Sequence, residues 1–447
     1  MTSPAFGPTH LATVRATLEH AHRELARHTP HTVPGRQPVH TLYGGAHLFK
    51  ADTARKMGQR ALEAMSTYAP DPHALAQCLE LDEALAARVH ARVVAKLRHE
   101  PVEDLRIDFE DGYGPRTDAE EDSHAEAAAR EVARGLSDGG LPPFLGIRVK
   151  PLHPARFERS TRTLDRFFTT LIATTGGRLP QPFIVTLPKV TTPEEPAALA
   201  HLLELVETHH GLRPGSIQVE LMVESSHALY GPDGRLVLPA LVEAARGRCV
   251  GVHLGPYDYT ASMDITAEHQ RLTHPACDFA RDVMQVALAG RGLALVDGPT
   301  SLLPVGPHKP GEAPLTEAQR EKNRQAVHRA WRLMHANVRH ALARGFYQGW
   351  DLHPAQLPIR YASVYAFFLE GLEAATLRLK SFVAQAAQAT RLGGVFDDAA
   401  TGQGLLNSFL RGLACGAITA EEVRATDLTV AELHERSFTR IIEQRRG

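Results

Sequence analysis

Carboxylates stand at the ends of strand-like runs in the sequence. The run at residues 219–224 ends on Glu224, and about 30 residues later the run GVHLGPYDY carries Asp258 near its end. A third run, LRIDFEDG, ends with Glu110 and Asp111. A single acid in such a place often caps the following helix. Several acids that converge would repel one another unless a cation lay among them, and a set of oxygen ligands favours Mg²⁺.

Two cationic side chains occupy the same kind of position. Arg148 lies near the end of the run FLGIRV, and Lys189 follows the run IVTLP. A guanidinium suits an oxyanion or a carboxylate because it stays charged and donates paired hydrogen bonds. A buried structural ion pair is the alternative. Strand alternation turns Asp108 away from Phe109, so Asp108 could point into the interior and pair with Lys189 or Arg148.

The elements that must position these residues alternate along the chain. About eight short runs rich in Val, Ile and Leu alternate with helical patterns between residues 38 and 357. Such strands are typical of a parallel sheet covered by helices. The pattern predicts a TIM (β/α)₈ barrel, in which the strand ends meet at one mouth. The competing doubly wound sheet lacks its usual glycine-rich fingerprint here.

Two segments flank the predicted barrel domain of residues 38–357. Residues 1–37 combine an amphipathic helix, at about residues 10–28, with a proline-rich linker. Residues 358–447 read as helical to the end and form a predicted C-terminal extension or lid.

The composition excludes several classes of function. The 447 residues have a formal net charge of -2 and an apolar share of 43%, which gives no global field toward nucleic acid or a membrane. No run approaches the ~18 apolar residues of a membrane span, and the N-terminus does not resemble a signal peptide. The four cysteines are far apart, so we expect no disulfide framework and a reducing, cytoplasmic compartment.

An ordered set of motifs carries a family resemblance. In chain order the motifs are IDFEDG, GIRVK, LPKV, ELMVES, GVHLGPYDY, LVDGP and GWDLHPAQ. Together they resemble the HpcH/HpaI aldolase/citrate lyase superfamily over about residues 38–357, although each motif alone is weak. The resemblance implies a Mg²⁺-dependent TIM barrel that makes or breaks carbon–carbon bonds through an enolate. It also implies a homo-oligomer.

The resemblance assigns roles to the acids. Glu224 and Asp258 match the metal ligands of the superfamily. Glu110 and Asp111 match acids that bind metal-bound waters or orient substrate, so we expect Glu110 to contact substrate and Asp111 to act in catalysis.

The resemblance also predicts substrate contacts. Arg148 matches the arginine that holds the enolate oxygen and the substrate carboxylate, and Lys189 is expected nearby. Gly255 would let the backbone approach the ligand, whereas Pro256 lacks the N–H that relatives offer there. Lys150 replaces the asparagine of most relatives, which puts the usual substrate recognition in doubt.

A second resemblance lies beyond the barrel. The segment GGVFDDAATGQGLLNSFLRGLACGAIT, residues 393–419, looks like the C-terminal helical plug of malate synthases, which delivers a catalytic aspartate over the barrel mouth. Asp398 matches that position and Asp397 is its neighbour. The alternative is that both acids cap a helix beginning near Ala399.

The predicted function is that of a Mg²⁺-dependent carbon–carbon lyase or synthase. Its substrate would be a small carboxylate or an acyl-CoA, with Asp398 as the base. A CoA-independent aldolase that releases pyruvate is one alternative, and a non-catalytic metal- or ligand-binding barrel is another. We expect no nucleic-acid partner, because no basic stripe with interleaved aromatics is present.

Overall fold

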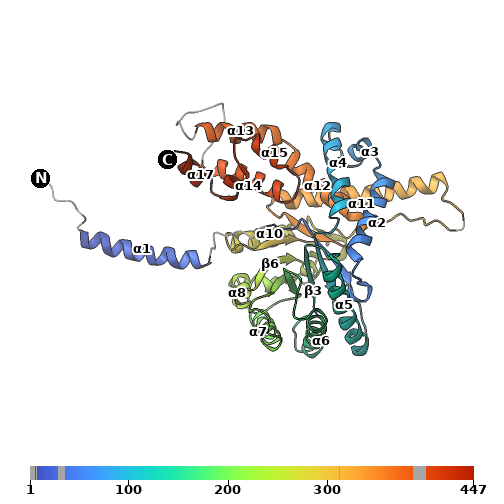
Figure 1. Cartoon of the computed structure of the whole chain (residues 1–447), viewed down its shortest axis with the longest axis horizontal. Helices are drawn as coiled ribbons and strands as arrows, with labels where there is room; N and C mark the ends of the chain where they lie inside the picture. The colour runs from blue at the N-terminus through green and yellow to red at the C-terminus, as the bar shows by residue number, and fades with distance from the viewer. Residues whose placement is uncertain (1–5, 7, 29–35, 312, 386–398, 447) are drawn as a thin grey trace.

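Eight parallel strands close into a barrel in the computed structural model, which describes residues 6, 8–28, 36–311, 313–385 and 399–446. Each strand pairs with the next, and β1 pairs with β8 to complete the ring (Figure 1). The strands are β1 (His40–Gly45), β2 (Asp104–Asp108), β3 (Phe144–Arg148), β4 (Phe183–Leu187), β5 (Ile217–Val223), β6 (Cys249–Leu254), β7 (Ala294–Asp297) and β8 (Gln348–Asp351). This architecture confirms the predicted TIM barrel.

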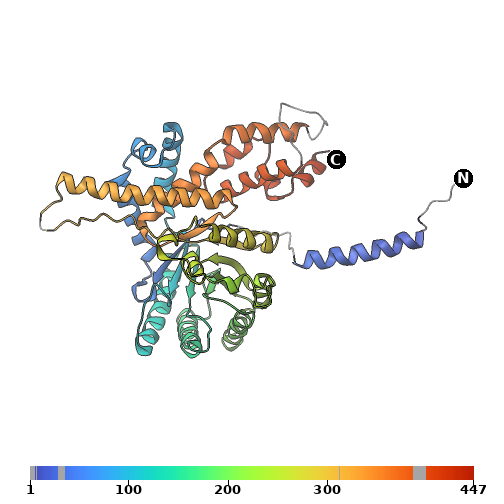
Figure 2. The same cartoon turned by 180° about the vertical axis from the view of Figure 1, so that it is seen from behind.

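Helices follow the strands and cover the barrel from outside (Figures 1 and 2). Between β1 and β8 these are α2 (Thr53–Tyr68), α3 (Pro72–Leu79), α4 (Glu83–His99), α5 (Asp118–Asp138), α6 (Phe157–Thr175), α7 (Glu194–His209), α8 (Leu238–Ala244), α9 (Pro256–Ala261), α10 (Pro275–Leu288) and α11 (Glu317–Ala343). After β8 comes α12 (Leu357–Leu369), which is buried along nearly its whole length and supplies the last helix of the ring. Short 3₁₀ turns η1 (Ala46–Leu48), η2 (Ser226–Ala228), η3 (Ala267–His269) and η4 (Pro354–Gln356) lie in the connections.

Charged side chains fill much of the barrel interior. Arg106, which is fully buried, donates hydrogen bonds to Asp104 and to both carboxylate oxygens of Glu220. His253 lies 3.1 Å from the same glutamate. Burial would favour a neutral Glu220, but Arg106 and His253 hold its pKa well below the ordinary value. The interior is therefore ordered by ion pairs that strand alternation directs inward.

One predicted strand gives way to a helix. We expected the strand to continue as far as Asp258, but β6 stops at Leu254 and α9 begins at Pro256. A proline at the first helical position costs no hydrogen bond and has its φ already set for a helix. Asp258 consequently lies in the first turn of a helix that points its N-terminus at the mouth.

The N-terminal segment is a separate helix. The amphipathic pattern predicted at about residues 10–28 corresponds to α1 (Pro8–His28), which projects away from the barrel (Figure 1). Its apolar residues Leu11, Val14 and Leu18 are all exposed. No helix among the described residues is long and apolar enough to cross a membrane.

The C-terminal helices sit at the N-terminal end of the barrel. They are α13 (Leu372–Gln385), α14 (Ala399–Ala414), α15 (Ala420–Arg424), α16 (Val430–His434) and α17 (Phe438–Arg446). Arg411 of α14 donates to Gln37, just before β1, and its guanidinium lies 4.6 Å from the ring centroid of Tyr347, just before β8. Helix α14 thus contacts the barrel at the end opposite the mouth. Asp397 and Asp398 lie outside the described residues, so the predicted lid, and the domain boundary after residue 357, stay predictions.

Candidate metal and substrate site

Three carboxylates from separate parts of the sequence meet at the barrel mouth. Asp111 follows β2, Glu224 directly follows β5, and Asp258 lies in α9 after β6. Each offers one oxygen, and the three oxygens lie within 4.8 Å of one another. Glu224 is buried, whereas Asp111 and Asp258 are exposed to the mouth. The sequence had paired Glu224 with Asp258, and the structure adds Asp111 as a third oxygen.

Glu224 is held in place by the backbone of the neighbouring strand end. The N–H of Lys189 donates to Glu224 Oε2 at 2.7 Å. Lys189 adopts φ 53, in the left-handed region that non-glycine residues rarely occupy. Strain of this kind persists where the surrounding structure requires it, often at functional sites.

Gly255 makes room for the same carboxylate. A Cβ at this position would lie 2.4 Å from Glu224 Cγ and 2.7 Å from its Oε1. We had expected the glycine to admit a ligand to the backbone. The close approach is instead to Glu224, and a substrate contact of Gly255 remains a prediction.

The charge on Glu224 calls for a cation. Burial raises the pKa of Glu224 to about 8, against the attraction of Arg148, and the negative charges of Glu110 and Asp258 raise it further. A carboxyl that loses its charge on burial regains it when a cation supplies the missing partner. Three oxygen donors, two of them open to solvent, suit Mg²⁺, which keeps waters beside one or two carboxylates. The residues present therefore fit the metal that the sequence predicted.

The ammonium group of Lys189 bridges Glu110 and Asp111. Its Nζ lies 2.5 Å from Glu110 Oε1 and 3.1 Å from Asp111 Oδ1. Burial favours the neutral amine, yet the hydrogen bond that Lys189 donates to Glu110 raises the pKa of Lys189 above its ordinary value. The ammonium thus fixes the two acids relative to each other while its side chain remains about one-third exposed.

Arg148 is locked by Asp108. Its Nε and Nη2 donate to the two oxygens of Asp108 at 2.7 and 2.5 Å, which settles the two predicted alternatives in favour of this pair over Lys189. Asp108 also accepts from the N–H groups of Glu110 and Gly112, at 2.9 and 2.7 Å. One buried aspartate therefore sets both the arginine and the turn that carries Glu110 and Asp111.

Three N–H groups of Arg148 remain beyond those given to Asp108, since a guanidinium has five. One side faces Glu110, with Nη1 3.2 Å from Oε2. The guanidinium also packs on two aromatic rings. Its central carbon lies 4.8 Å from the ring centroid of Tyr43 and 5.9 Å from that of Trp350. The sequence reading missed this aromatic support, although Tyr43 and Trp350 lie in β1 and β8 where alternation turns them inward.

Some predicted residues stand apart from the acids. Pro256 is buried, and a Cβ on Gly298 would lie 2.3 Å from its Cδ, so its packing is apolar and its substrate role stays a prediction. Lys150 donates to Glu121 and to the carbonyl of Phe109, both at 2.6 Å. Lys150, which replaces the asparagine of most relatives, thus holds the residues that follow β2.

The comparisons with known proteins add a family to this geometry. Residues 18–441 match the model of a family described as a domain of unknown function, DUF6986. The chain belongs to the DUF6986 family. None of the curated proteins compared with this DUF6986 chain matches it.

Solved structures share the barrel of this DUF6986 protein. A citrate lyase from Burkholderia xenovorans LB400 aligns over 90% of this chain and 99% of its own, with 18% identity and a TM-score of 0.56. This likeness shows a shared fold, the one that the resemblance to the HpcH/HpaI superfamily implies.

Two further similar structures superpose less closely. A Mycobacterium tuberculosis CitE protein in complex with magnesium and pyruvate covers 74% of this chain and 92% of its own, at 16% identity and a TM-score of 0.40. A Haloferax volcanii malate synthase covers 91% and 96%, at 14% identity and a TM-score of 0.43. At these TM-scores neither likeness carries weight for this chain.

Proposed function

We propose that this protein is a Mg²⁺-dependent carbon–carbon lyase or synthase that acts through an enolate. The observation that carries the proposal is the meeting of Asp111, Glu224 and Asp258 within 4.8 Å beside a fixed arginine at a barrel mouth, where enzymes of this fold keep their active sites. The shared fold with a citrate lyase supports the same reaction class. The substrate is a keto acid or an acyl-CoA-type carboxylate.

The three acids would hold the metal. Bound Mg²⁺ supplies a Lewis acid that polarises a substrate carbonyl oxygen and orients a neighbouring carboxylate. Glu224 contributes the buried oxygen, and its fixed contact with the Lys189 N–H limits where the site forms. Asp111 and Asp258 lie toward solvent and leave room for substrate.

Arg148 stabilises negative charge that develops on the substrate oxygen. Its position is set in advance by Asp108, so no reorganisation is needed as the charge forms, and preorganised donors of this kind supply much of the catalysis in acyl and enolate chemistry. The guanidinium is buried, which strengthens its attraction for an oxyanion. Asp108 acts as a positioning residue through Arg148.

A base must move a proton at the carbon beside the carbonyl. We assign this role to Asp398, on its match to the malate synthase segment, with Asp397 as the neighbouring acid. The match alone carries this assignment: α14 begins one residue later, and its Arg411 contacts the barrel at the end opposite the mouth.

Proton exchange tests the proposal directly. Proton NMR in D₂O with Mg²⁺ would follow pyruvate, oxaloacetate and acetyl-CoA separately, watching for exchange of hydrogen for deuterium beside the carbonyl. We expect Mg²⁺-dependent exchange in the wild type and none in Glu224→Gln. The donor that exchanges distinguishes a CoA-dependent enzyme from a CoA-free aldolase. Metal-dependent exchange that persists in Glu224→Gln would refute this assignment of the site.

A further inference from the structure

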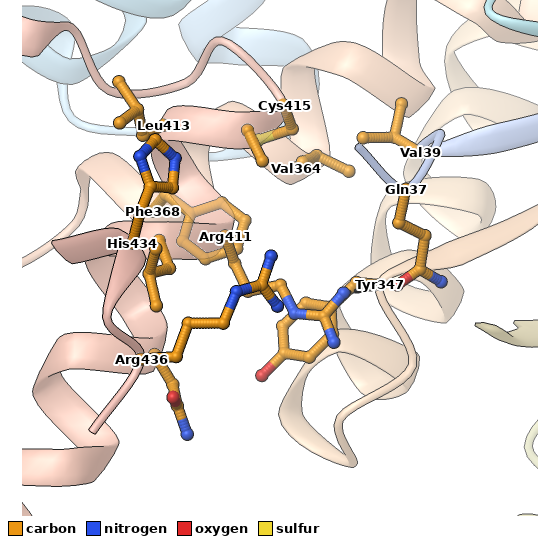
Figure 3. A pocket seen from close by; sticks show the side chains of 13 residues that line it. Gln37, Val39, Tyr347, Val364, Phe368, Arg411, Leu413, Cys415, His434 and Arg436 are labelled. Atoms are coloured by element: carbon orange, nitrogen blue, oxygen red, sulfur yellow. Dashed lines mark hydrogen bonds between the residues drawn. The ribbon is translucent and has the colours of Figure 1, made fainter. Parts of the chain in front are cut away.

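A cavity lies at the end of the barrel opposite the three acids. It has a volume of about 300 Å³, within the range of small-molecule sites. The barrel contributes Gln37, Val39 and Tyr347 from beside β1 and β8, and Val364 and Phe368 from α12. Helix α14 and the residues around α16 form the opposite wall (Figure 3). The cavity is thus enclosed between the barrel and the C-terminal helices.

Two guanidinium groups enter this cavity. Arg411 comes from α14 and Arg436 follows α16, and both side chains reach the centre of the view in Figure 3. Arg411 donates to the amide oxygen of Gln37 and rests on the ring of Tyr347. No carboxylate among the described residues forms an ion pair with Arg411. Within the described part of the chain, its positive charge is therefore met by neutral groups and lies on the same cavity as a second guanidinium.

Burial and the neighbouring guanidinium both disfavour the positive charge of Arg411. Burial lowers the pKa of Arg411 from its ordinary value, and the charge of Arg436 lowers it further. An arginine stays protonated in proteins, so it cannot relieve the repulsion by losing its proton. Two guanidinium groups on one cavity are an arrangement that recognises carboxylate or phosphate, because each donates paired hydrogen bonds.

Apolar side chains form much of the remaining lining, beside the polar Gln37, Asn407 and His434. Val364 and Phe368 are buried, and Leu410 and Leu413 complete the wall from α14. Inorganic anions would leave this surface in contact with water. An organic body attached to the anionic head would cover it.

We propose that this cavity binds a small organic anion, with a carboxylate or phosphate head between Arg411 and Arg436 and an apolar body against Val364 and Phe368. The ligand would bridge the barrel and the C-terminal helices, and so stabilise their contact by mass action. This site is separate from the mouth and does not depend on the proposed function.

Calorimetric titration of the full-length protein tests the site. The probes are phenyl phosphate, phenylacetate, inorganic phosphate and neutral benzyl alcohol. We expect one of the two aromatic anions to bind at least about tenfold more tightly than inorganic phosphate and benzyl alcohol, because only it has both head and body. The better aromatic anion identifies the head group. Equal binding of benzyl alcohol would overturn the proposal.

Matched variants locate the binding. Arg411→Met and Arg436→Met, on two different elements, should each weaken binding of the better aromatic anion about tenfold or more. Arg440→Met removes an exposed charge of α17 outside the cavity, and Lys189→Met removes a cation at the mouth; both should bind as the wild type does. The unliganded thermal midpoint of each variant shows whether the fold is intact, and Arg411→Lys, which keeps the charge, should bind better than Arg411→Met. Unchanged affinity in either methionine variant of the cavity, or no binding of both aromatic anions by the wild type, would overturn the proposal.

Discussion

The backbone N–H of Lys189 donates to Glu224 across two strand ends, at 2.7 Å, while the ammonium of the same lysine lies 2.5 Å from Glu110. One residue thus contacts the buried acid with its main chain and the β2 turn with its side chain. The left-handed φ of Lys189 allows both contacts at once. The acids of the mouth are consequently placed by the backbone as much as by side-chain packing.

Gly255→Ala should weaken Mg²⁺ binding by about tenfold or more, because the new Cβ would overlap Glu224 and displace a ligand. Calorimetric titration with Mg²⁺ measures the change. Gly311→Ala is the matched control, since a Cβ there meets no atom within 4 Å. Equal affinity in both variants would show that Glu224 can move without loss.

The stability of the metal-free protein should fall as pH rises from about 5 to about 8. Glu224 has a folded pKa of about 8 against an ordinary value of 4.5, so in this window the folded state binds a proton that the unfolded state has lost. The stability is complete below the unfolded pKa and is lost through the folded pKa, up to an upper limit of about 5 kcal/mol. Thermal midpoints in chelator across this range, for the wild type and Glu224→Gln, measure the effect. A midpoint with the same pH dependence in both proteins would contradict it.

Below about pH 8, Mg²⁺ affinity should increase about tenfold for each unit by which the pH is raised, because the metal must displace the proton on Glu224. Titrations at several pH values, in buffers with different ionisation enthalpies, report the number of protons released. Release of no proton at pH 6 would mean that Glu224 is already charged without the metal.

Asp108→Asn should lower kcat by about 10²-fold while leaving Mg²⁺ affinity nearly unchanged. The new amide would bring a donor toward Arg148 and toward the N–H groups of Glu110 and Gly112, which all donate to the native aspartate. Turnover of the substrate found by proton exchange, together with Mg²⁺ titration, separates the two effects. Asp297→Asn is the control, since Asp297 forms a similar buried pair with Arg281; it should lower the thermal midpoint and spare kcat.

Asp398→Asn should bind Mg²⁺ as the wild type does and lose turnover, because it removes the proposed base and no metal ligand. Asp397→Asn, one residue away, should keep most of the activity. Wild-type turnover in Asp398→Asn would exclude this residue as the base.

The order of strands and helices was predictable because apolar runs and helical periodicity alternate so regularly. The barrel followed, since eight such units close a ring, and the convergence of Glu224, Asp258 and Asp111 followed from the rule that strand ends meet at one mouth. Pattern reasoning did not find α3 (Pro72–Leu79), whose eight residues are too few for a clear periodicity.

Other features depend on contacts that no local pattern records. The sequence favoured a strand up to Asp258, but the Pro256 start of α9 turned that aspartate into a helix residue. The residues next to Arg411 in the sequence do not indicate that it packs against Gln37 and Tyr347. Both partners are more than 60 residues away along the chain. The sequence predicted that Gly255 makes room for a ligand. Its close approach to Glu224 could not be predicted, because the two residues follow different strands.

The paired charges inside the barrel constrain how this sequence can change. Arg106 serves Asp104 and Glu220 together, and His253 shares the second acid. Loss of Arg106 would leave two buried carboxylates without their cation, at a cost of about 3–5 kcal/mol. Accepted substitutions among relatives should therefore come in coordinated sets, so these positions should covary across the family while the apolar positions around them drift singly.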